Sequence, residues 1–564
     1  MTQTPTLSTE SIGHEEAPQQ GESNSKISPA EVKTETQTPL SATNEEVLKF
    51  LSGWKLAAVV CSTTLVVFMI LLDVSIISTA VPRITSEFHA LDDVGWYAAA
   101  YQLASASLQP LTGKFYTHFN TKWTFISFVV VFEVGSLICG IAKSSPMFIG
   151  GRTIAGLGGS GLINGGLTMI SGAVSTEKRA LYTSLMMGFG QLGLISGPLI
   201  GGSLTEYATW RWCFYINLPI GAVALVFLVL THIPELTHKP RFTLSLVREV
   251  VPELDLIGFL LFVPASLMFL LALQFGGNDY PWSSSVIIGL FCGAGVAAIV
   301  FILWERRVGD KAMIPGSIIK HKIAISSALQ GMFLLGTVFV ASYYFPIYFQ
   351  AVKGVGPTLS GVYLLPSIFS QLLFVVASGW LITKLGYYLP WPIAAGILSA
   401  VGNGLVSTFS PTTETAKWVG YQILLGAGRG AGMQTAMIAI QNNMPGRQIP
   451  VAIAFQIFCQ NILGAILLVV ASVIFTQSLA TELSKHAPSV TPEAASAAGG
   501  SASAVRALVP PGSPELDGLL LAYSNSVDRV FYLLVALSVV SFVAAWGMGW
   551  KDTRKKNQPG KGAP

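Results

Sequence analysis

Long apolar segments separated by short polar ones make up most of the chain, and this alternation restricts what it can fold into. A helix needs about twenty mostly apolar residues to cross the hydrocarbon core of a bilayer. The segments that meet this requirement lie at 55–79, 94–112, 123–142, 146–168, 181–203, 212–232, 255–275, 285–304, 323–349, 359–383, 390–409, 418–440, 451–476 and 528–549. The sequence therefore predicts an all-α integral membrane protein with fourteen transmembrane helices.

The composition supports a membrane protein. Charged residues make up 11% of the 564 residues and hydrophobic residues 51%, whereas soluble domains carry roughly 25% charged residues. The 56 glycines suit helices that pack closely in lipid. The net charge of +4 is small, and no long basic run precedes the C-terminal tail. We expect the lipid bilayer as the surroundings and no nucleic-acid partner.

The loops predict the orientation of the chain. With the N-terminus inside, the inside segments hold 23 lysines and arginines and the outside segments hold 8, and basic residues favour the cytosolic side. Both termini are therefore predicted to be cytosolic. The plasma membrane is the expected location, with a vacuolar or vesicular membrane as the alternative. Residues 1–49 lack aromatic residues and are predicted to be a disordered cytosolic tail.

Three charged residues in the first half lie inside apolar segments, where charge is costly and usually functional. Asp73 and Arg152 each lie about six residues from the outer end of their segment, roughly 9 Å deep, so they could form an ion pair if their helices are neighbours. Glu133 lies near the middle of 123–142. A carboxyl group in apolar surroundings favours its neutral form and can load and release a proton. The alternative for all three is a structural role in bracing the helices.

The segment 181–203 carries a stripe of glycines. Gly193, Gly197 and Gly201 are spaced by four residues, which places them on one helix face, and Gly202 follows. Such a stripe permits close contact with another helix. Pro198 interrupts the backbone hydrogen bonding and favours a bend. The combination predicts a conformational element, although passive packing would use the same residues.

Several motifs resemble those of the fourteen-helix drug:proton antiporters of the major facilitator superfamily, in particular the branch of fungal toxin and secondary-metabolite efflux pumps. The resemblance extends from about residue 50 to residue 550. It rests on LDVSIISTAVP at 72–82, GRTIAGLGGSG at 151–161, GLISGPLIGG at 193–202, WRWCFYINLPIG at 210–221, GYQILLGAGRGAGMQT at 420–435 and IPVAIAFQIFCQN at 449–461. Taken together, these motifs are specific for the family but not for a substrate.

The sequence departs from the family in the loop between the second and third helices. The usual pattern is G-x-L-x-D-R-x-G-R-K, and this chain has GKFYTHFNTK at 113–122. Gly113 and Lys122 match the pattern, whereas Thr117 replaces the aspartate and His118 the arginine. The family's charge-based latch between the two halves is therefore in doubt at this position. His118 is interpreted as an ordinary loop histidine, with a titrating role near neutral pH as the alternative.

The resemblance implies a major facilitator fold, with two six-helix bundles around a central cavity and two inserted helices. The implied parts are a tail at 1–49, a first bundle at 50–232, a cytosolic linker at 233–254, inserted helices at 255–304, a cytosolic loop at 305–322, a second bundle at 323–549 that contains a long extracellular loop at 477–527, and a basic cytosolic tail at 550–564. Alternating access about a site near the midplane is the expected mode of action.

The function implied is proton-coupled export of a small organic molecule, a fungal secondary metabolite, toxin or drug, by a monomer. Candidate cavity residues are polar or aromatic side chains on the predicted helices, although interhelical packing or hydrogen bonding is an alternative for each: Gln102, Gln109, Asn164, Tyr343, Tyr344, Arg429, Gln456 and Gln460. A proton-coupled importer of a nutrient or chelated metal is the alternative within transporters, and a receptor-like sensor is an alternative outside them.

Enzyme chemistry has no support in the sequence. No HExxH, GxSxG or Walker A motif and no haem-ligand spacing occurs. The five cysteines are far apart, without a CxxC or His/Cys cluster. We expect no enzymatic activity, no cofactor and no bound metal, with small molecules and protons as the transported partners.

Overall fold

The computed structural model describes residues 50–89, 94–235, 237, 239, 243, 250–277, 280–498, 502–510 and 513–554, and these are almost entirely helical. The predicted tail at 1–49 and the end of the tail at 550–564 lie outside the described residues. Helices of the first half are α1 (Gly53–Phe88), α2 (Val94–His118), α3 (Thr121–Ile141), α4 (Ser145–Ala173), α5 (Thr176–Tyr207), α6 (Trp212–Tyr215) and α7 (Asn217–Leu230). The helices that follow are α9 (Leu256–Phe275), α10 (Ser285–Val308), α11 (Gly316–Lys320), α12 (Lys322–Ile347), α13 (Pro357–Tyr363), α14 (Leu365–Leu385), α15 (Pro390–Val406), α16 (Thr415–Met433), α17 (Thr435–Asn443), α18 (Ile449–His486), α19 (Pro492–Ala498), α20 (Ala502–Arg506) and α21 (Glu515–Ala545).

Eleven of the fourteen predicted segments fall mainly on one helix each, whereas 212–232, 359–383 and 418–440 each fall on two consecutive helices. Ten stretches of the described residues are long and apolar enough to cross a membrane. The helix α15 is apolar but shorter, and α2, α4 and α5 are not among the ten. These last three are rich in glycine, serine and threonine, as expected of helices that turn much of their surface toward other helices rather than lipid.

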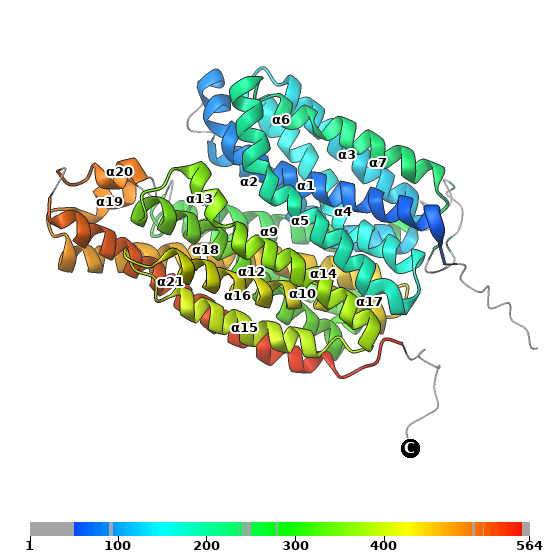
Figure 1. Cartoon of the computed structure of the whole chain (residues 1–564). Helices are drawn as coiled ribbons and strands as arrows, with labels where there is room; N and C mark the ends of the chain where they lie inside the picture. Colours follow the sequence, from blue (N-terminus) through cyan, green and yellow to red (C-terminus); the bar gives the residue numbers. More distant parts are fainter. Residues whose placement is uncertain are drawn as a thin grey trace, which may run out of the picture. The chain divides into compact units, whose positions relative to one another are not determined.

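Contacts between helices are concentrated within each half of the chain. In the first half, α1 packs along α5, and α4 packs along α2 and α3 (Figure 1). In the second half, α16 lies between α14 and α15, while α12 packs on α18 and α21. Small residues permit these approaches, because a side chain at Gly135 of α3 or Gly158 of α4 would overlap the backbone of the facing helix.

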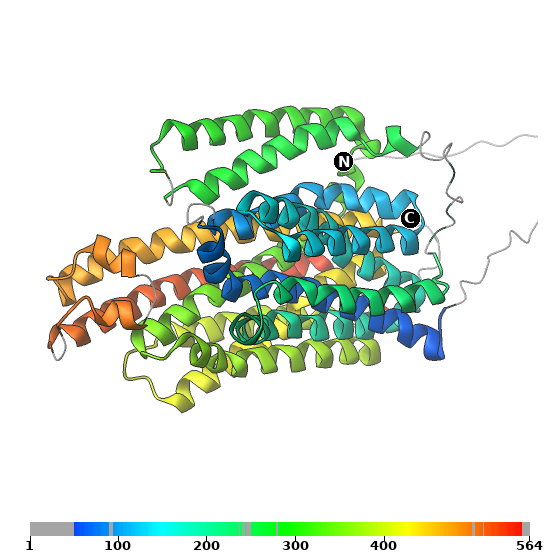
Figure 2. The same cartoon turned by 90° about the horizontal axis from the view of Figure 1, so that it is seen from above.

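The helices α9 and α10 form an antiparallel pair, visible as the green hairpin in Figure 2. Asp255 organises its base. Its carboxylate accepts hydrogen bonds from the Gly258 amide (3.0 Å) at the start of α9, from the Trp304 indole (2.8 Å) and from the Met313 amide (2.9 Å). Capping of this kind satisfies amides that have no partner at a helix N-terminus.

The two halves meet along two helix pairs, α5 with α14 and α2 with α18. Both pairs approach closely. A Cβ atom on Gly113 of α2 would lie 2.7 Å from Cα of Val451 on α18, and one on Gly188 of α5 would lie 3.3 Å from Leu372 of α14. One buried hydrophobic cluster includes Val59 and Leu167 from the first half and Ile440 and Val451 from the second.

Helix extends into both ends of the segment 477–527. The sequence predicts helices that end at 476 and begin at 528, whereas α18 continues to His486 and α21 begins at Glu515, with α19 and α20 between them. The two extensions bury apolar side chains against each other, among them Leu483 and Leu519. Glu482 also accepts a hydrogen bond from Asn525 (2.8 Å), which ties the two extensions together.

Candidate functional site

Asp73 and Arg152 form a buried ion pair in the first half. An Nη1 atom of Arg152 on α4 lies 2.6 Å from Oδ2 of Asp73 on α1, and both side chains are at most 2% exposed. Their equal depth in the sequence suggested this contact, and the two helices are indeed neighbours. At this burial each charge depends on the other, since removing one partner leaves an uncompensated charge.

Aromatic side chains surround the arginine of this pair. The guanidinium lies over the ring of Tyr101 at 4.6 Å from the centroid and 6.0 Å from that of Phe214. Its Nε donates a hydrogen bond to the Tyr97 carbonyl at 3.0 Å. The cation is therefore held by a carboxylate, a carbonyl and two ring faces, which fixes its position on α4.

A third polar group completes the network. Asn217, at the start of α7, donates from its amide nitrogen to Oδ1 of Asp73 and to the Ser136 hydroxyl of α3, both at 3.2 Å. The residues come from α1, α3, α4 and α7, so this site joins most helices of the first half. Protonation of Asp73 would weaken contacts to Arg152 and Asn217 together.

Glu133 differs from Asp73, because neither of its buried carboxylate oxygens has a hydrogen-bond partner. The side chain extends from α3 toward Gly221 of α7, where any Cβ would overlap it. Unpaired buried carboxylates are rare, and neutralisation by a proton is the ordinary way to keep one in apolar surroundings. Geometry therefore makes Glu133 suitable to carry a proton.

The predicted glycine stripe of α5 packs against α1. A Cβ atom on Gly193 would overlap the Phe68 carbonyl, and one on Gly197 would lie 2.5 Å from Cβ of Ser75. Gly201 is buried and its carbonyl faces the Cys213 thiol, whereas Gly202 has open space around it. The side chain of Pro198 lies outside the described part of the structure. Since Ser75 is two residues from Asp73, the stripe lies directly behind the ion pair.

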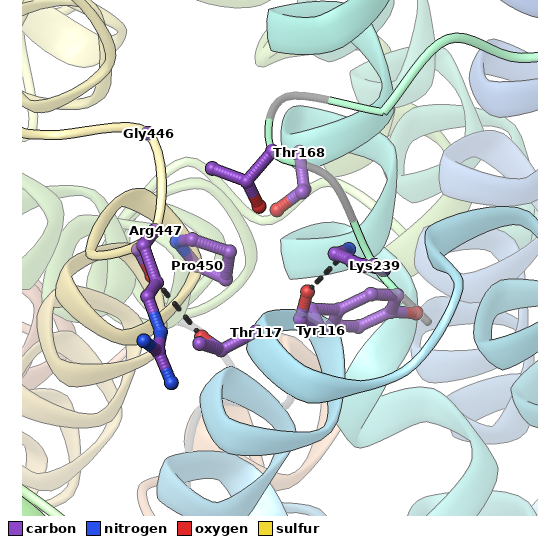
Figure 3. A pocket seen from close by; sticks show the side chains of 8 residues that line it. Tyr116, Thr117, Thr168, Lys239, Gly446, Arg447 and Pro450 are labelled. Carbon is purple, nitrogen blue, oxygen red and sulfur yellow. Dashed lines mark hydrogen bonds between the residues drawn. The ribbon is translucent and has the colours of Figure 1, made fainter. Parts of the chain in front are cut away.

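Residues 113–122, which lack the family's aspartate, contact the second half of the chain. The Thr117 hydroxyl donates to the Gly113 carbonyl (2.8 Å) and lies 3.2 Å from the Arg447 carbonyl, just before α18. Figure 3 shows this contact beside a small pocket that Tyr116, Lys239 and Pro450 also line. Lys122 makes contacts within the first half. Its ammonium donates to the carbonyls of Val229 and Thr231 (2.8 and 2.9 Å) at the end of α7.

An ionic contact lies at the same end of the helices. Glu253 is 3.3 Å from Nδ1 of His118 on α2 and 3.6 Å from the guanidinium of Arg447. Burial lowers the pKa of His118, while the carboxylate of Glu253 acts in the opposite direction. Glu253 precedes α9, so the segment before α9 supplies a carboxylate near the place where the family's aspartate is missing.

Gln441 of α17 forms hydrogen bonds to helices of the first half at this same end of the molecule. Its carbonyl accepts from Arg179 of α5 (2.6 Å), its side-chain oxygen accepts from the Thr183 hydroxyl (3.0 Å), and its amide donates to the Leu167 carbonyl of α4 (3.2 Å). All three bonds cross between the halves and all are buried. The structure is therefore shut at the end that carries residues 113–122.

The predicted cavity residues are divided between the two halves. Gln109 and Asn164 are buried between α2 and α4, where Asn164 donates to the Thr112 hydroxyl (3.1 Å) and the Gln109 amide nitrogen has no partner. The side chains of Gln102 and Tyr343 are exposed, and the ring of Tyr344 packs on that of Phe475. The pocket of Figure 3 contains none of these residues.

Arg429, Gln456 and Gln460 are buried in the second half. Gln456 and Gln460 lie on α18 and both approach Gly331 of α12. An Nη2 atom of Arg429 donates to the Thr337 carbonyl at 3.2 Å, and its Nε has no partner. In the described part of the chain, no carboxylate pairs with this arginine.

Sequence reasoning missed three buried polar groups that bear on the site. Asn217 lies in the motif at 210–221, whose match to the family does not identify its direct contact with Asp73. Gln330 and Gln441 lie in or beside apolar segments, and the rule applied to charged residues would have selected them had it been extended to amides. Among the described residues, no group of three histidine, cysteine or acidic side chains could hold a metal ion.

Comparison with known proteins gives a consistent result. The family model described as Major Facilitator Superfamily matches residues 63–469. An MFS-type transporter, calB of Penicillium decumbens, is 62% identical over 94% of this chain and 95% of its own length. An efflux pump, mlcE of Penicillium citrinum, is 49% identical over 94% and 96%. The solved structure of the human organic anion transporter MFSD10 covers 87% of this chain and 99% of its own with a TM-score of 0.55, and at 13% identity it indicates the fold alone.

Proposed function

Because this chain belongs to the Major Facilitator Superfamily, whose members here are transporters and not enzymes, we propose that it exports a small organic molecule in exchange for protons. Membership makes it a multi-pass membrane protein with a small-molecule substrate. Its relatives include proteins named as fungal efflux pumps, which supports export. The substrate proposed is a fungal secondary metabolite or a related toxin or drug.

The observation that carries proton coupling is the buried network around Asp73. An external proton on Asp73 removes its charge and releases Arg152 from the 2.6 Å ion pair. The glycine stripe of α5 against α1 lies behind that pair, so the change in charge acts on a close helix contact. A ligand that binds one state better than another shifts the population of states, and here the proton is that ligand. Glu133 serves as a second carrier beside it.

The proposal includes a topology. All fourteen helical segments cross the membrane, as two six-helix bundles with α9 and α10 inserted between them, and both termini are cytosolic. Of the four helices that are not among the ten apolar stretches, α2, α4 and α5 cross because their polar faces turn inward, and α15 crosses as a shorter apolar helix. The closed end described above is then the cytosolic side, and the protein is a monomer in the plasma membrane.

Export is testable in two steps. Deletion of the gene, compared with its restoration, identifies the molecule that falls in the culture medium and rises inside the cells. That molecule is then offered to everted membrane vesicles, whose cytosolic face points outward. With an acidic lumen, protons leave as substrate enters, so the antiporter accumulates the molecule, and a protonophore abolishes the accumulation.

The outcomes separate this function from its alternative. An importer would leave the vesicle lumen empty under the acidic-inside gradient and would accumulate substrate only in right-side-out vesicles with acid outside. Export that persists without a pH gradient would contradict proton coupling. A deletion that changes no metabolite in the medium would contradict export.

A further inference from the structure

Arg429 is a buried cation without an anion. The side chain extends from α16 and its residue is 5% exposed, yet among the described residues its one hydrogen-bond partner is a carbonyl, that of Thr337 on α12. The Nε–H has no acceptor, and no carboxylate of the described chain acts on the guanidinium. A buried guanidinium without a counter-charge is unfavourable, so an anion from another molecule would find a prepared partner here.

Two buried glutamines, on α12 and α18, also lack hydrogen-bond partners. Both side-chain atoms of Gln330 on α12 and both of Gln456 on α18 are buried and make no hydrogen bond. Gln330 approaches α16, since its Nε2 lies 3.5 Å from the place of a Cβ atom on Gly432. Gly432 and Arg429 are three residues apart, on adjacent turns of one helix face. Gln456 approaches the neighbouring Gly331 of α12, at 2.7 Å from the place of its Cβ.

The chemistry of these groups selects their ligand. A guanidinium and two amide N–H groups are donors, and all three lie on or against α12. Arginine binds a carboxylate through two parallel hydrogen bonds, which neutral acceptors match poorly. Leu334 and Ala436 lie beside the same glycines and offer an apolar surface. Native proteins seldom leave buried amides unpaired, and in a transporter the substrate can supply the missing acceptors.

We propose that Arg429, with Gln330 and Gln456, binds the acidic group of the exported molecule, so that the substrate is an amphipathic organic acid. This assignment rests on the function proposed above, because it names the substrate class of that export. The negative charges of the first half do not oppose it. Asp73 is already neutralised by Arg152, and the acid binds on the other half of the molecule.

The test is equilibrium binding to the purified full-length protein in nanodiscs, with two fluorescent probes that share one ring system. Pyrenebutyrate carries a carboxylate and pyrenebutanol a hydroxyl. Wild type should bind the acid about tenfold more tightly than the alcohol. Arg429→Gln should weaken pyrenebutyrate binding by about tenfold to a hundredfold, as expected for a charged hydrogen bond, and should change pyrenebutanol binding by less than about twofold.

Matched variants make the result specific. Lys417→Gln removes an exposed cation from the same helix and should leave both affinities unchanged. If Arg429→Gln does not fold, Gln456→Leu decides the matter, with pyrenebutyrate binding about threefold to tenfold weaker than in wild type. Equal binding of the two probes by wild type, binding of neither, or an acid preference that survives in the variant that folds would overturn the proposal.

Binding requires no proton gradient and no direction of transport. Acid-selective binding that depends on Arg429, together with failed gradient-driven export, would therefore overturn the proposed function and leave the acid site standing. Proton-driven export together with equal binding of the two probes would overturn the acid site and leave the proposed function standing.

Discussion

Two buried arginines lie on glycine-rich helices of the two halves, and their surroundings differ. Arg152 on α4 has a carboxylate at 2.6 Å, a carbonyl at 3.0 Å and an aromatic ring over its face. Arg429 on α16 has one carbonyl at 3.2 Å and an unpaired Nε. The first half thus holds a complete ionic network, whereas the second half holds donors that lack acceptors. We infer that the first half responds to protons and the second to substrate.

Removing Arg152 should have the largest effect and tests the ionic network of the first half most strongly. In Arg152→Gln, Asp73 keeps its burial and loses its counter-charge, so we expect a loss of stability of about 3–5 kcal/mol. Thermal unfolding of the purified protein measures it. The double variant with Asp73→Asn should regain part of the loss, because neither charge remains. A single variant as stable as wild type would show that the ion pair does not hold the first half together.

The contact behind the ion pair gives the next largest effect. Gly193→Ala places a methyl group against the Phe68 carbonyl, which should cost about 1–3 kcal/mol and separate α5 from α1. Gly202→Ala, on the same helix but in open space, should change stability by less than about 0.5 kcal/mol. Equal effects of the two substitutions on unfolding would contradict the close packing of α5 on α1.

The effect of Arg429→Gln on stability should be opposite in sign to that of Arg152→Gln. It removes an unpaired buried charge and keeps an amide that can still donate to Thr337, so the apo protein should gain about 1 kcal/mol. Thermal unfolding without ligand is the measurement. A loss of stability as large as that of Arg152→Gln would mean that Arg429 has an unrecognised counter-charge, and the two halves would then be alike.

The smallest effect concerns His118, where the halves meet through Glu253. Burial lowers the pKa of His118 below its ordinary value of 6.5, so the unfolded chain takes up the proton first as the pH falls. Stability should therefore decline from about pH 7 down to the folded-state pKa and then level off. His118→Gln should remove this part of the decline. An unchanged pH dependence of the melting temperature would exclude His118 as the cause.

Much of the fold followed from apolar length alone, because a bilayer demands it. Every predicted segment is helical in the structure. Charge inside an apolar segment was the signal that selected Asp73, Glu133 and Arg152 as candidate site residues. The equal depths of Asp73 and Arg152 allowed an ion pair if their helices were neighbours, and the structure shows that the helices are neighbours and that the pair forms.

Other features depend on which helix faces which, and a single sequence does not specify that. Glu253 contacts His118 across 135 positions of chain, and no local pattern announces the contact. Gln330 escaped notice because a neutral amide costs less in lipid than a charge and therefore stands out less in the sequence. The helical ends of 477–527 were missed because those residues bury apolar side chains in one another and not in lipid.

The most direct test of proton coupling in the first half uses Asp73→Asn in everted vesicles loaded with the identified substrate. Two rates are compared: accumulation driven by an acidic lumen, and exchange of labelled for unlabelled substrate without a gradient. We predict that accumulation disappears while exchange stays within about threefold of wild type, because the acid site at Arg429 is intact. Gradient-driven accumulation that survives unchanged in Asp73→Asn would contradict the assignment of Asp73 as the coupling group.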